Sequence, residues 1–227
     1  MFYFDSTYIL VILGALICAL ASMGVSSTYK KFSNVLSSRR MTGRDAAELI
    51  LRSAGITDVS IQRVSGNLTD HYSPKEKVLR LSDSVYGSTS VAAIGVAAHE
   101  CGHAIQHQVK YGPLGLRSAA VPIANIGSYL SWPVILLGLV LGMQGLAQFG
   151  VILFCFVVFF QLITLPVEFN ASRRAMRILE DHGILMGQEL DGAGKVLNAA
   201  AMTYVAAAFS SILQLLRLVL LTGRRRD

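Results

Sequence analysis

Two histidines four residues apart, with a glutamate directly after the first, are the residues of this sequence best suited to do chemistry. They lie in VAAHECGHAIQHQ, residues 96–108, a run that is otherwise mostly small and apolar. On a helix His99 and His103 are about one turn apart, so both imidazoles project from the same side and can bind one ion. Zinc is the usual ion for two nitrogens at this spacing. Glu100 could then act as a general base on a water molecule without binding the metal itself.

A zinc ion that does hydrolysis needs a third protein ligand and one open position. His107 lies about 12 Å along the helix from His99, so it cannot share the ion, and we expect it to pair with a polar group near the helix end. The preferred third ligand is Glu168 in LPVEFNASRRAMRILEDHG, because a carboxylate beside apolar segments is costly unless it is bound or paired. Pro166 can start a helix, which would place Glu168 in its first turn. A purely structural pairing of Glu168 with a nearby arginine is the alternative. The competing ligands are Glu180, Asp181 and His182.

The composition places these residues in a membrane protein. Hydrophobic residues make up 53% of the chain, charged residues 15%, and the mean hydropathy is +0.52. Apolar segments long enough to cross a bilayer core of about 30 Å lie at 8–25, 118–141, 146–165 and 198–221. We therefore predict a mostly α-helical, polytopic membrane protein with three or four transmembrane helices. The first segment is expected to be a retained anchor, because its basic residues follow it instead of preceding it.

The distribution of Lys and Arg predicts the orientation. They are concentrated in residues 26–117 and 166–195, so both segments should face the cytoplasm, with the chain in the cell (inner) membrane. A fourth crossing would place Arg224–Arg226 outside, against this tendency, so the last apolar segment could instead lie along the inner interface.

The predicted order is an N-terminal transmembrane anchor (1–25), a cytoplasmic catalytic part with a β-ribbon and the metal-binding helix (26–117), a transmembrane hairpin (118–165), a cytoplasmic helix with the third ligand (166–197), and a C-terminal apolar helix with a basic tail (198–227).

The cytoplasmic part before the two histidines is predicted to be a small α+β element. Thr42 followed by Asp45 resembles a helix N-cap, and Gly55 should end that helix. The segments 59–64 and 77–82 are β-prone and are separated by turn-forming residues, which predicts a two-stranded β-ribbon. An alanine-rich helix should then span residues 91–108.

Four stretches of the sequence carry a family resemblance: DHYSPKEKVLRLSDSVY, SVAAIGVAAHECGHAIQHQ, LPVEFNASRRA and LNAAAMTYVAAA. Together they resemble the bacterial membrane-bound neutral zinc metallopeptidases of the YugP-like family, over residues 40–221, and more distantly the HtpX-like and CAAX-prenyl membrane proteases. The resemblance implies a gluzincin-like peptidase with one Zn²⁺ per chain, bound by His99, His103 and Glu168, with Glu100 catalytic. The distant relatives have an acidic residue four positions after the ligand glutamate, where this sequence has Ser172, so the group that orients a ligand histidine is left unassigned.

The function predicted from these observations is a zinc-dependent membrane-bound endopeptidase that hydrolyses peptide bonds through a metal-activated water. Its partners would be the lipid bilayer and peptide or protein substrates, including membrane proteins, whereas no motif indicates nucleic-acid binding. One alternative is a site-2-like intramembrane protease that uses Asp191 of ELDGAG, although the residues before it are polar for a buried span. Another is a non-catalytic zinc-binding membrane protein. The candidates for stabilising the oxyanion are Arg173, Arg174 and His182, and the two arginines could equally face lipid headgroups.

Overall fold

The computed structural model describes residues 6–223, so Arg224–Arg226 and the conflict they pose for the orientation lie outside the described residues. The chain divides into two compact units. The helical unit comprises the described parts of Met1–Ser22, Gly115–Pro166 and Met202–Asp227. The mixed unit comprises Met23–Leu114 and Val167–Ala201, and it contains both histidines of the predicted metal site.

Helices dominate the described chain, as the composition predicted. The elements in order are α1 (Tyr8–Ser33), α2 (Gly43–Ser53), β1 (Ser60–Val64), β2 (His71–Ser73), β3 (Val78–Ser82), α3 (Asp83–Tyr86), α4 (Val91–Gln108), α5 (Gly112–Val140), α6 (Gln144–Asp181) and α7 (Gln188–Gly223). Among the described residues, α1, α5, α6 and α7 are long and apolar enough to cross a membrane. The predicted fold class, a mostly helical protein with up to four spans and a small sheet, is confirmed.

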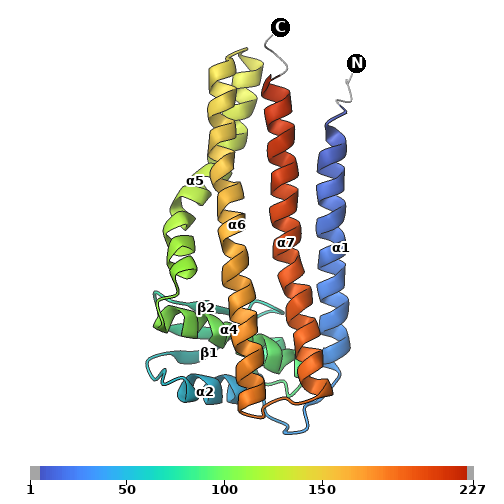
Figure 1. The fold of residues 1–227 in the computed structure, drawn as a ribbon, viewed down its shortest axis with the longest axis vertical. Coiled ribbons are helices and arrows are strands. Elements are labelled where there is room, and N and C mark those ends of the chain that lie inside the picture. The colour runs from blue at the N-terminus through green and yellow to red at the C-terminus, as the bar shows by residue number, and fades with distance from the viewer. Residues whose placement is uncertain (1–5, 224–227) are drawn as a thin grey trace. The chain divides into compact units, whose positions relative to one another are not determined.

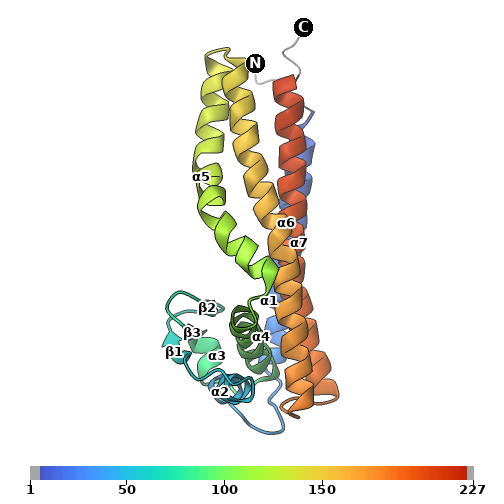
Figure 2. The same ribbon diagram turned by 60° about the vertical axis from the view of Figure 1, so that its left-hand side comes forward.

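In the helical unit α5 and α6 form an antiparallel hairpin (Figure 1). Glycines let the two helices approach closely: a Cβ at Gly127 would lie 2.6 Å from the carbonyl oxygen of Leu153, and one at Gly150 would lie 2.9 Å from that of Ser131. α5 is visibly curved and contains two prolines, each of which removes a hydrogen bond from the helix (Figure 2).

The structure corrects one helix boundary near the third candidate ligand. Pro166 was expected to begin a new helix, but it lies inside α6, which runs unbroken from Gln144 to Asp181. A proline removes only one backbone donor, and a long apolar helix can tolerate that loss. Glu168 therefore lies within one continuous helix and not in the first turn of a new one.

The core of the mixed unit is built around α4 and the sheet. α2 begins at the predicted cap: Thr42 Oγ1 accepts the N–H of Asp45, and the Asp45 carboxylate accepts the N–H of Thr42. The apolar face of α2 packs with α4 and β3 in one cluster. Its fully buried members include Ile50, Leu79, Leu81, Ile94, Ala97 and Cys101.

The sheet differs from the predicted two-stranded ribbon. It has three strands in the order β1-β3-β2, with β1 parallel and β2 antiparallel to β3. The prediction was wrong because it treated the whole segment between β1 and β3 as a turn, whereas residues 71–73 in it form β2. β3 is almost entirely buried, so a neighbouring strand on each side satisfies the backbone groups along both of its edges.

Candidate metal centre

α4 carries three of the predicted functional side chains. Its N-terminus is capped by Ser90, whose Oγ accepts the N–H of Ala93 at 3.2 Å. The small side chains of α4 pack into the core, and His99 and His103 project from the helix, largely buried. Their rings meet edge to face, with centroids 4.8 Å apart. The helix thus places both imidazoles together, as the four-residue spacing predicted.

The structure brings Glu168 of α6 to these histidines. Figures 1 and 2 both show α4 lying beside the end of α6 that contains this residue. The Glu168 side chain is almost fully buried, and its Oε2 lies 3.3 Å from His99 Nε2 and 3.6 Å from His103 Nε2. Among the residues that the structure describes, these three form a cluster of His, Cys, Asp or Glu side chains that could hold a metal ion.

The geometry of these three atoms fits a zinc ion. Ligand atoms about 2.1 Å from an ion, at tetrahedral angles, lie about 3.4 Å from one another. The two distances from Glu168 Oε2 are close to this value, and all three ligand atoms lie within 4.8 Å of one another. Two imidazole nitrogens and one carboxylate oxygen are also a donor set that zinc accepts in hydrolases, where a fourth position stays open.

Each histidine has a hydrogen-bonding partner on its other ring nitrogen. His99 Nδ1 lies 3.1 Å from Ser172 Oγ, and His103 Nδ1 lies 3.0 Å from Gln106 Oε1. Such partners orient the rings so that Nε2 faces the metal position. Ser172 stands at the position where the sequence left the orienting group unassigned, and Gln106 was not predicted. Their signals were present: Ser172 is four residues after Glu168, and Gln106 is three residues after His103 on the same helix.

Glu100 is held beside the histidines by the sheet. Its carboxylate is buried, and Oε2 accepts the backbone N–H of Tyr72 in β2 at 3.1 Å. The hydroxyl of Tyr72 lies 2.9 Å from His107 Nδ1, so His107 has the polar partner that was predicted for it. One residue of β2 therefore contacts α4 at two positions, 100 and 107, which are two helical turns apart.

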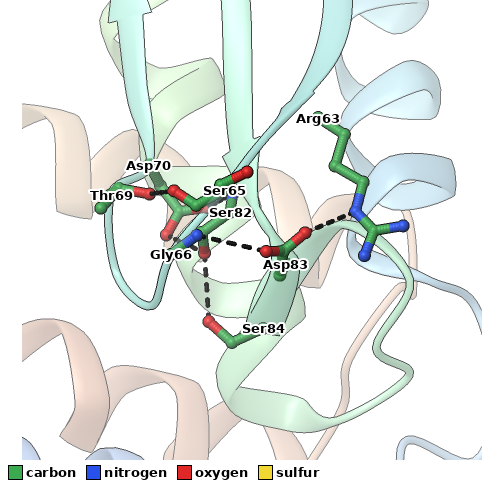
Figure 3. A network of polar contacts seen from close by, with 8 residues as sticks. All are labelled: Arg63, Ser65, Gly66, Thr69, Asp70, Ser82, Asp83 and Ser84. Atoms are coloured by element: carbon green, nitrogen blue, oxygen red, sulfur yellow. Dashed lines mark hydrogen bonds and ion pairs between the residues drawn. The ribbon is translucent and has the colours of Figure 1, made fainter.

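A network of polar contacts fixes the loop that leads into β2 (Figure 3). The Asp70 carboxylate accepts the N–H of Ser82 at 2.7 Å and its hydroxyl at 2.8 Å. The Asp83 carboxylate accepts Arg63 Nε at 2.6 Å and the N–H of Gly66 at 3.2 Å. Both ends of the loop between β1 and β2 are therefore tied to the end of β3 and the start of α3, which places Tyr72 against Glu100.

Burial and the charges of the site shift the pKa values of three nearby groups, Asp70, His103 and Cys101. Burial raises the pKa of Asp70, and the charge of Glu100 adds to this, although the hydrogen bonds from Ser82 oppose it. Burial disfavours the charged form of His103, but the carboxylates of Glu168 and Glu100 outweigh burial and raise its pKa. Burial also raises the pKa of Cys101 far above its usual range, and its thiol contacts the carbonyl of Ala47. Cys101 is therefore a neutral core residue and not a ligand.

The remaining candidates, for the third ligand or for stabilising the oxyanion, are not part of this group of three residues. Arg173 is exposed, and its Nε lies 3.4 Å from the carbonyl of Phe169 on its own helix. Arg174 donates from Nε to Asn170 Oδ1 at 2.8 Å, with its guanidinium over the Tyr111 ring. The remaining four are exposed, and none of them belongs to a group of three possible ligands among the described residues: Glu180, Asp181, His182 and Asp191.

These features describe a mostly helical protein with four candidate membrane spans and three side chains, His99, His103 and Glu168, that could hold a metal ion beside a buried glutamate. The chain belongs to the family described as "Putative neutral zinc metallopeptidase", whose model matches residues 7–223. It is also 48% identical over 207 residues to the "Putative membrane protease YugP" of Bacillus subtilis (strain 168), a match that covers 91% of this chain and 92% of that protein. No solved structure matches the chain. The family resemblance of the four sequence stretches is confirmed.

Proposed function

We propose that the protein is a zinc-dependent membrane-bound endopeptidase of the gluzincin type. His99, His103 and Glu168 bind one zinc ion per chain, and Glu100 is the general base. The observation that carries this proposal is the spacing of three candidate ligand atoms, which fits a tetrahedral ion, directly beside a glutamate that is not one of the three. The family and the name of the Bacillus relative support the same activity.

The residues of the chain can perform the proton transfers of peptide hydrolysis. Zinc, when bound, makes a water molecule more acidic and polarises the carbonyl of the substrate. Glu100 takes a proton from the attacking water while the water oxygen bonds to the carbonyl carbon. It then gives that proton to the nitrogen, which leaves as the C–N bond breaks. The N–H of Tyr72 holds the carboxylate in place for both transfers.

The position of β2 supports an extended peptide as the substrate. β2 is an edge strand that pairs with β3 on one side only. The N–H of Tyr72 points away from β3 and towards Glu100, so the other edge of β2 faces the catalytic helix. An extended chain that adds to such an edge forms backbone hydrogen bonds that do not depend on its sequence. The substrate class would then be peptides or unfolded segments of proteins, including membrane proteins.

The cellular setting follows from the spans and the charges. We place the chain in the cell membrane as a multi-pass protein, with its active site facing the cytoplasm. The four candidate spans support the membrane. The concentration of Lys and Arg in residues 26–117 and 166–195 supports the orientation. The partners, which are the bilayer and peptide or protein substrates, stay a prediction, as does the absence of nucleic-acid binding.

The test measures zinc and hydrolysis on the same samples. The full chain, purified in detergent, is analysed for bound metal and assayed with a library of quenched peptides. Glu100→Gln should keep stoichiometric zinc and lose at least about 100-fold in hydrolysis, because the amide cannot accept the proton. Glu180→Gln, an exposed glutamate on α6, is the matched control and should behave as wild type.

The other outcomes are also informative. Full hydrolysis by Glu100→Gln would overturn the mechanism. Loss of zinc in that variant would make Glu100 a ligand or a structural support of the site. A wild-type protein that binds zinc and cleaves no peptide would be the non-catalytic zinc protein.

A further inference from the structure

Three polar side chains form a hydrogen-bonded chain that leads away from His103. Gln106 Oε1 lies 3.0 Å from His103 Nδ1, and Gln106 Nε2 lies 3.0 Å from Asn170 Oδ1. Asn170 Oδ1 also accepts Arg174 Nε at 2.8 Å. Gln106 is fully buried, and its Nε2 has a second acceptor, the backbone carbonyl of Val167, at 2.8 Å. A buried amide with all of these contacts has a defined orientation.

The direction of every hydrogen bond in this chain is fixed by two groups, the guanidinium of Arg174 and the backbone carbonyl of Val167. A guanidinium has donors only, so Asn170 must present its carbonyl oxygen to it. That same oxygen then faces Gln106, which must present its NH₂ group, and the carbonyl of Val167 imposes the same orientation. The oxygen of Gln106 is left for His103, whose Nδ1 must therefore carry a hydrogen. The lone pair of the neutral ring is then on Nε2, the atom 3.6 Å from Glu168 Oε2.

His99 has no comparable chain of hydrogen bonds to fix its tautomer. Its Nδ1 is next to the hydroxyl of Ser172, which can donate or accept, so this contact is compatible with either tautomer of His99. The neighbouring Arg173 is exposed, and its Nε lies 3.4 Å from the carbonyl of Phe169 on its own helix. The arrangement is therefore specific to His103.

We propose that Gln106, oriented by the carbonyl of Val167 and by Asn170 with its Arg174 donor, sets the tautomer of His103 and so keeps its Nε2 available to the metal. The three side chains are positioning residues, and none touches the reacting atoms. This role deepens the proposed function, because it assumes that His103 is a ligand. It also gives Arg174 a task other than stabilising the oxyanion or facing lipid headgroups.

The tautomer can be measured directly in the metal-free protein. The full chain is labelled with ¹⁵N-histidine, and long-range ¹H–¹⁵N spectra are recorded in detergent at alkaline pH, where the imidazoles are neutral. The His103 signal, assigned by its loss in His103→Gln, should show the form with hydrogen on Nδ1. Gln106→Met should give a mixture of tautomers, because it removes the acceptor beside His103 Nδ1. The matched variant Gln108→Met, at an exposed position of the same helix, should leave the signal unchanged. The Nε2–H form in the wild type, or equal spectra for the two glutamine variants, would overturn the proposal.

Substitutions at Asn170 separate hydrogen-bond direction from packing. Asn170→Asp should preserve the Nδ1–H form, because a carboxylate accepts from both Arg174 and Gln106. Asn170→Leu has similar bulk and removes one of the two acceptors of Gln106 Nε2, so it should weaken the preference for the Nδ1–H form less than Gln106→Met does, because the carbonyl of Val167 stays. A larger effect of Asn170→Leu than of Gln106→Met would mean that Gln106 does not control the ring.

Zinc affinity provides the second measurement. Gln106→Met should bind zinc about 10 to 100 times more weakly, the usual effect of removing a group that orients a ligand. Asn170→Asp should bind zinc as the wild type does, and thermal unfolding in detergent checks that both variants are folded. Wild-type zinc affinity in Gln106→Met would overturn the inference and leave the proposed function intact. A wild-type protein that binds no zinc would instead end the proposed function, and the tautomer measurement would still decide the inference.

Discussion

Gly102 of α4 packs directly on the backbone of Ala171 of α6. A Cβ added at Gly102 would lie 2.6 Å from the carbonyl oxygen of Ala171 and 3.1 Å from its Cα. Gly102 directly precedes His103, and Ala171 lies three residues after Glu168. The absence of a side chain at position 102 therefore allows α4 and α6 to approach closely enough for the three candidate ligands that they carry to meet.

Gly102→Ala should destabilise the protein and weaken zinc binding. In an unconstrained helix interior this change is favourable by about 1 kcal/mol. Here the new methyl group meets backbone atoms, which cannot rotate away, and overpacking of this kind costs about 1–3 kcal/mol. Thermal unfolding in detergent and a zinc competition assay measure the two effects.

Gly87→Ala is the control for the glycine substitution. Gly87 has a negative φ of −101°, and a Cβ there would meet nothing within 4 Å. This variant should be as stable as the wild type and should bind zinc normally. A Gly102→Ala protein that is at least as stable as wild type, with unchanged zinc affinity, would show that the helices have room to separate.

Glu168→Ala and Asp191→Ala should have opposite effects on bound zinc. The first removes a ligand atom 3.3 Å from His99 Nε2, so zinc affinity should fall by more than the roughly 10- to 100-fold expected for an orienting residue. The second changes an exposed side chain in the first turn of α7 and should be nearly silent. Metal analysis after gel filtration compares them. Stoichiometric zinc in Glu168→Ala would remove Glu168 from the site, and zinc loss in Asp191→Ala would favour the site-2-like alternative.

Local sequence signals predicted the elements that carry the site. α4 spans Val91–Gln108, the range expected from its hydroxyl cap and its run of small residues. The capping box at Thr42 and the four apolar segments were also visible, because caps and hydropathy depend on residues close together in the chain. The pairing of His99 with His103 follows from the helical repeat alone.

Features that depend on distant residues could not be predicted in the same way. β1 and β3 are neighbours in the sheet although β2 lies between them in the sequence. No local pattern distinguishes this arrangement from a hairpin. The hydrogen bonds from Gln106 to Val167 and Asn170 join residues more than 60 positions apart. Pro166 was expected to begin a helix because proline is common at helix starts, but the surrounding apolar helix continues through it.

Asp70→Asn should change how stability depends on pH. The pKa of Asp70 is raised above its ordinary value of 3.8, mainly by burial, so between the ordinary and the raised pKa the folded state binds more protons than the unfolded state. The wild-type protein should therefore lose stability relative to Asp70→Asn as the pH rises through this range. The asparagine can still accept the N–H of Ser82. The melting temperatures of both proteins are measured across acidic pH. Subtracting one from the other removes the contributions of the titrating groups that the two proteins share.

The sign of that difference decides the result. If the wild type gained stability relative to Asp70→Asn with rising pH, the pKa of Asp70 would be lowered in the folded state. A difference that does not vary with pH would mean that Asp70 titrates alike in the folded and unfolded chains. Either outcome would show that the hydrogen bonds from Ser82 offset the cost of burying the carboxylate.

Thiol labelling of intact cells tests the orientation of the chain. Lys75→Cys lies on an exposed turn between β2 and β3, and Met143→Cys lies in the turn between α5 and α6, where the native side chain is 54% exposed. If the basic segments face the cytoplasm, a membrane-impermeant reagent should label Met143→Cys in intact cells and Lys75→Cys only after the cells are opened. The wild-type protein is the control, because Cys101 is buried and Cys18 and Cys155 lie in the candidate spans α1 and α6. Labelling of Lys75→Cys in intact cells, with protection of Met143→Cys, would place the metal centre outside the cell.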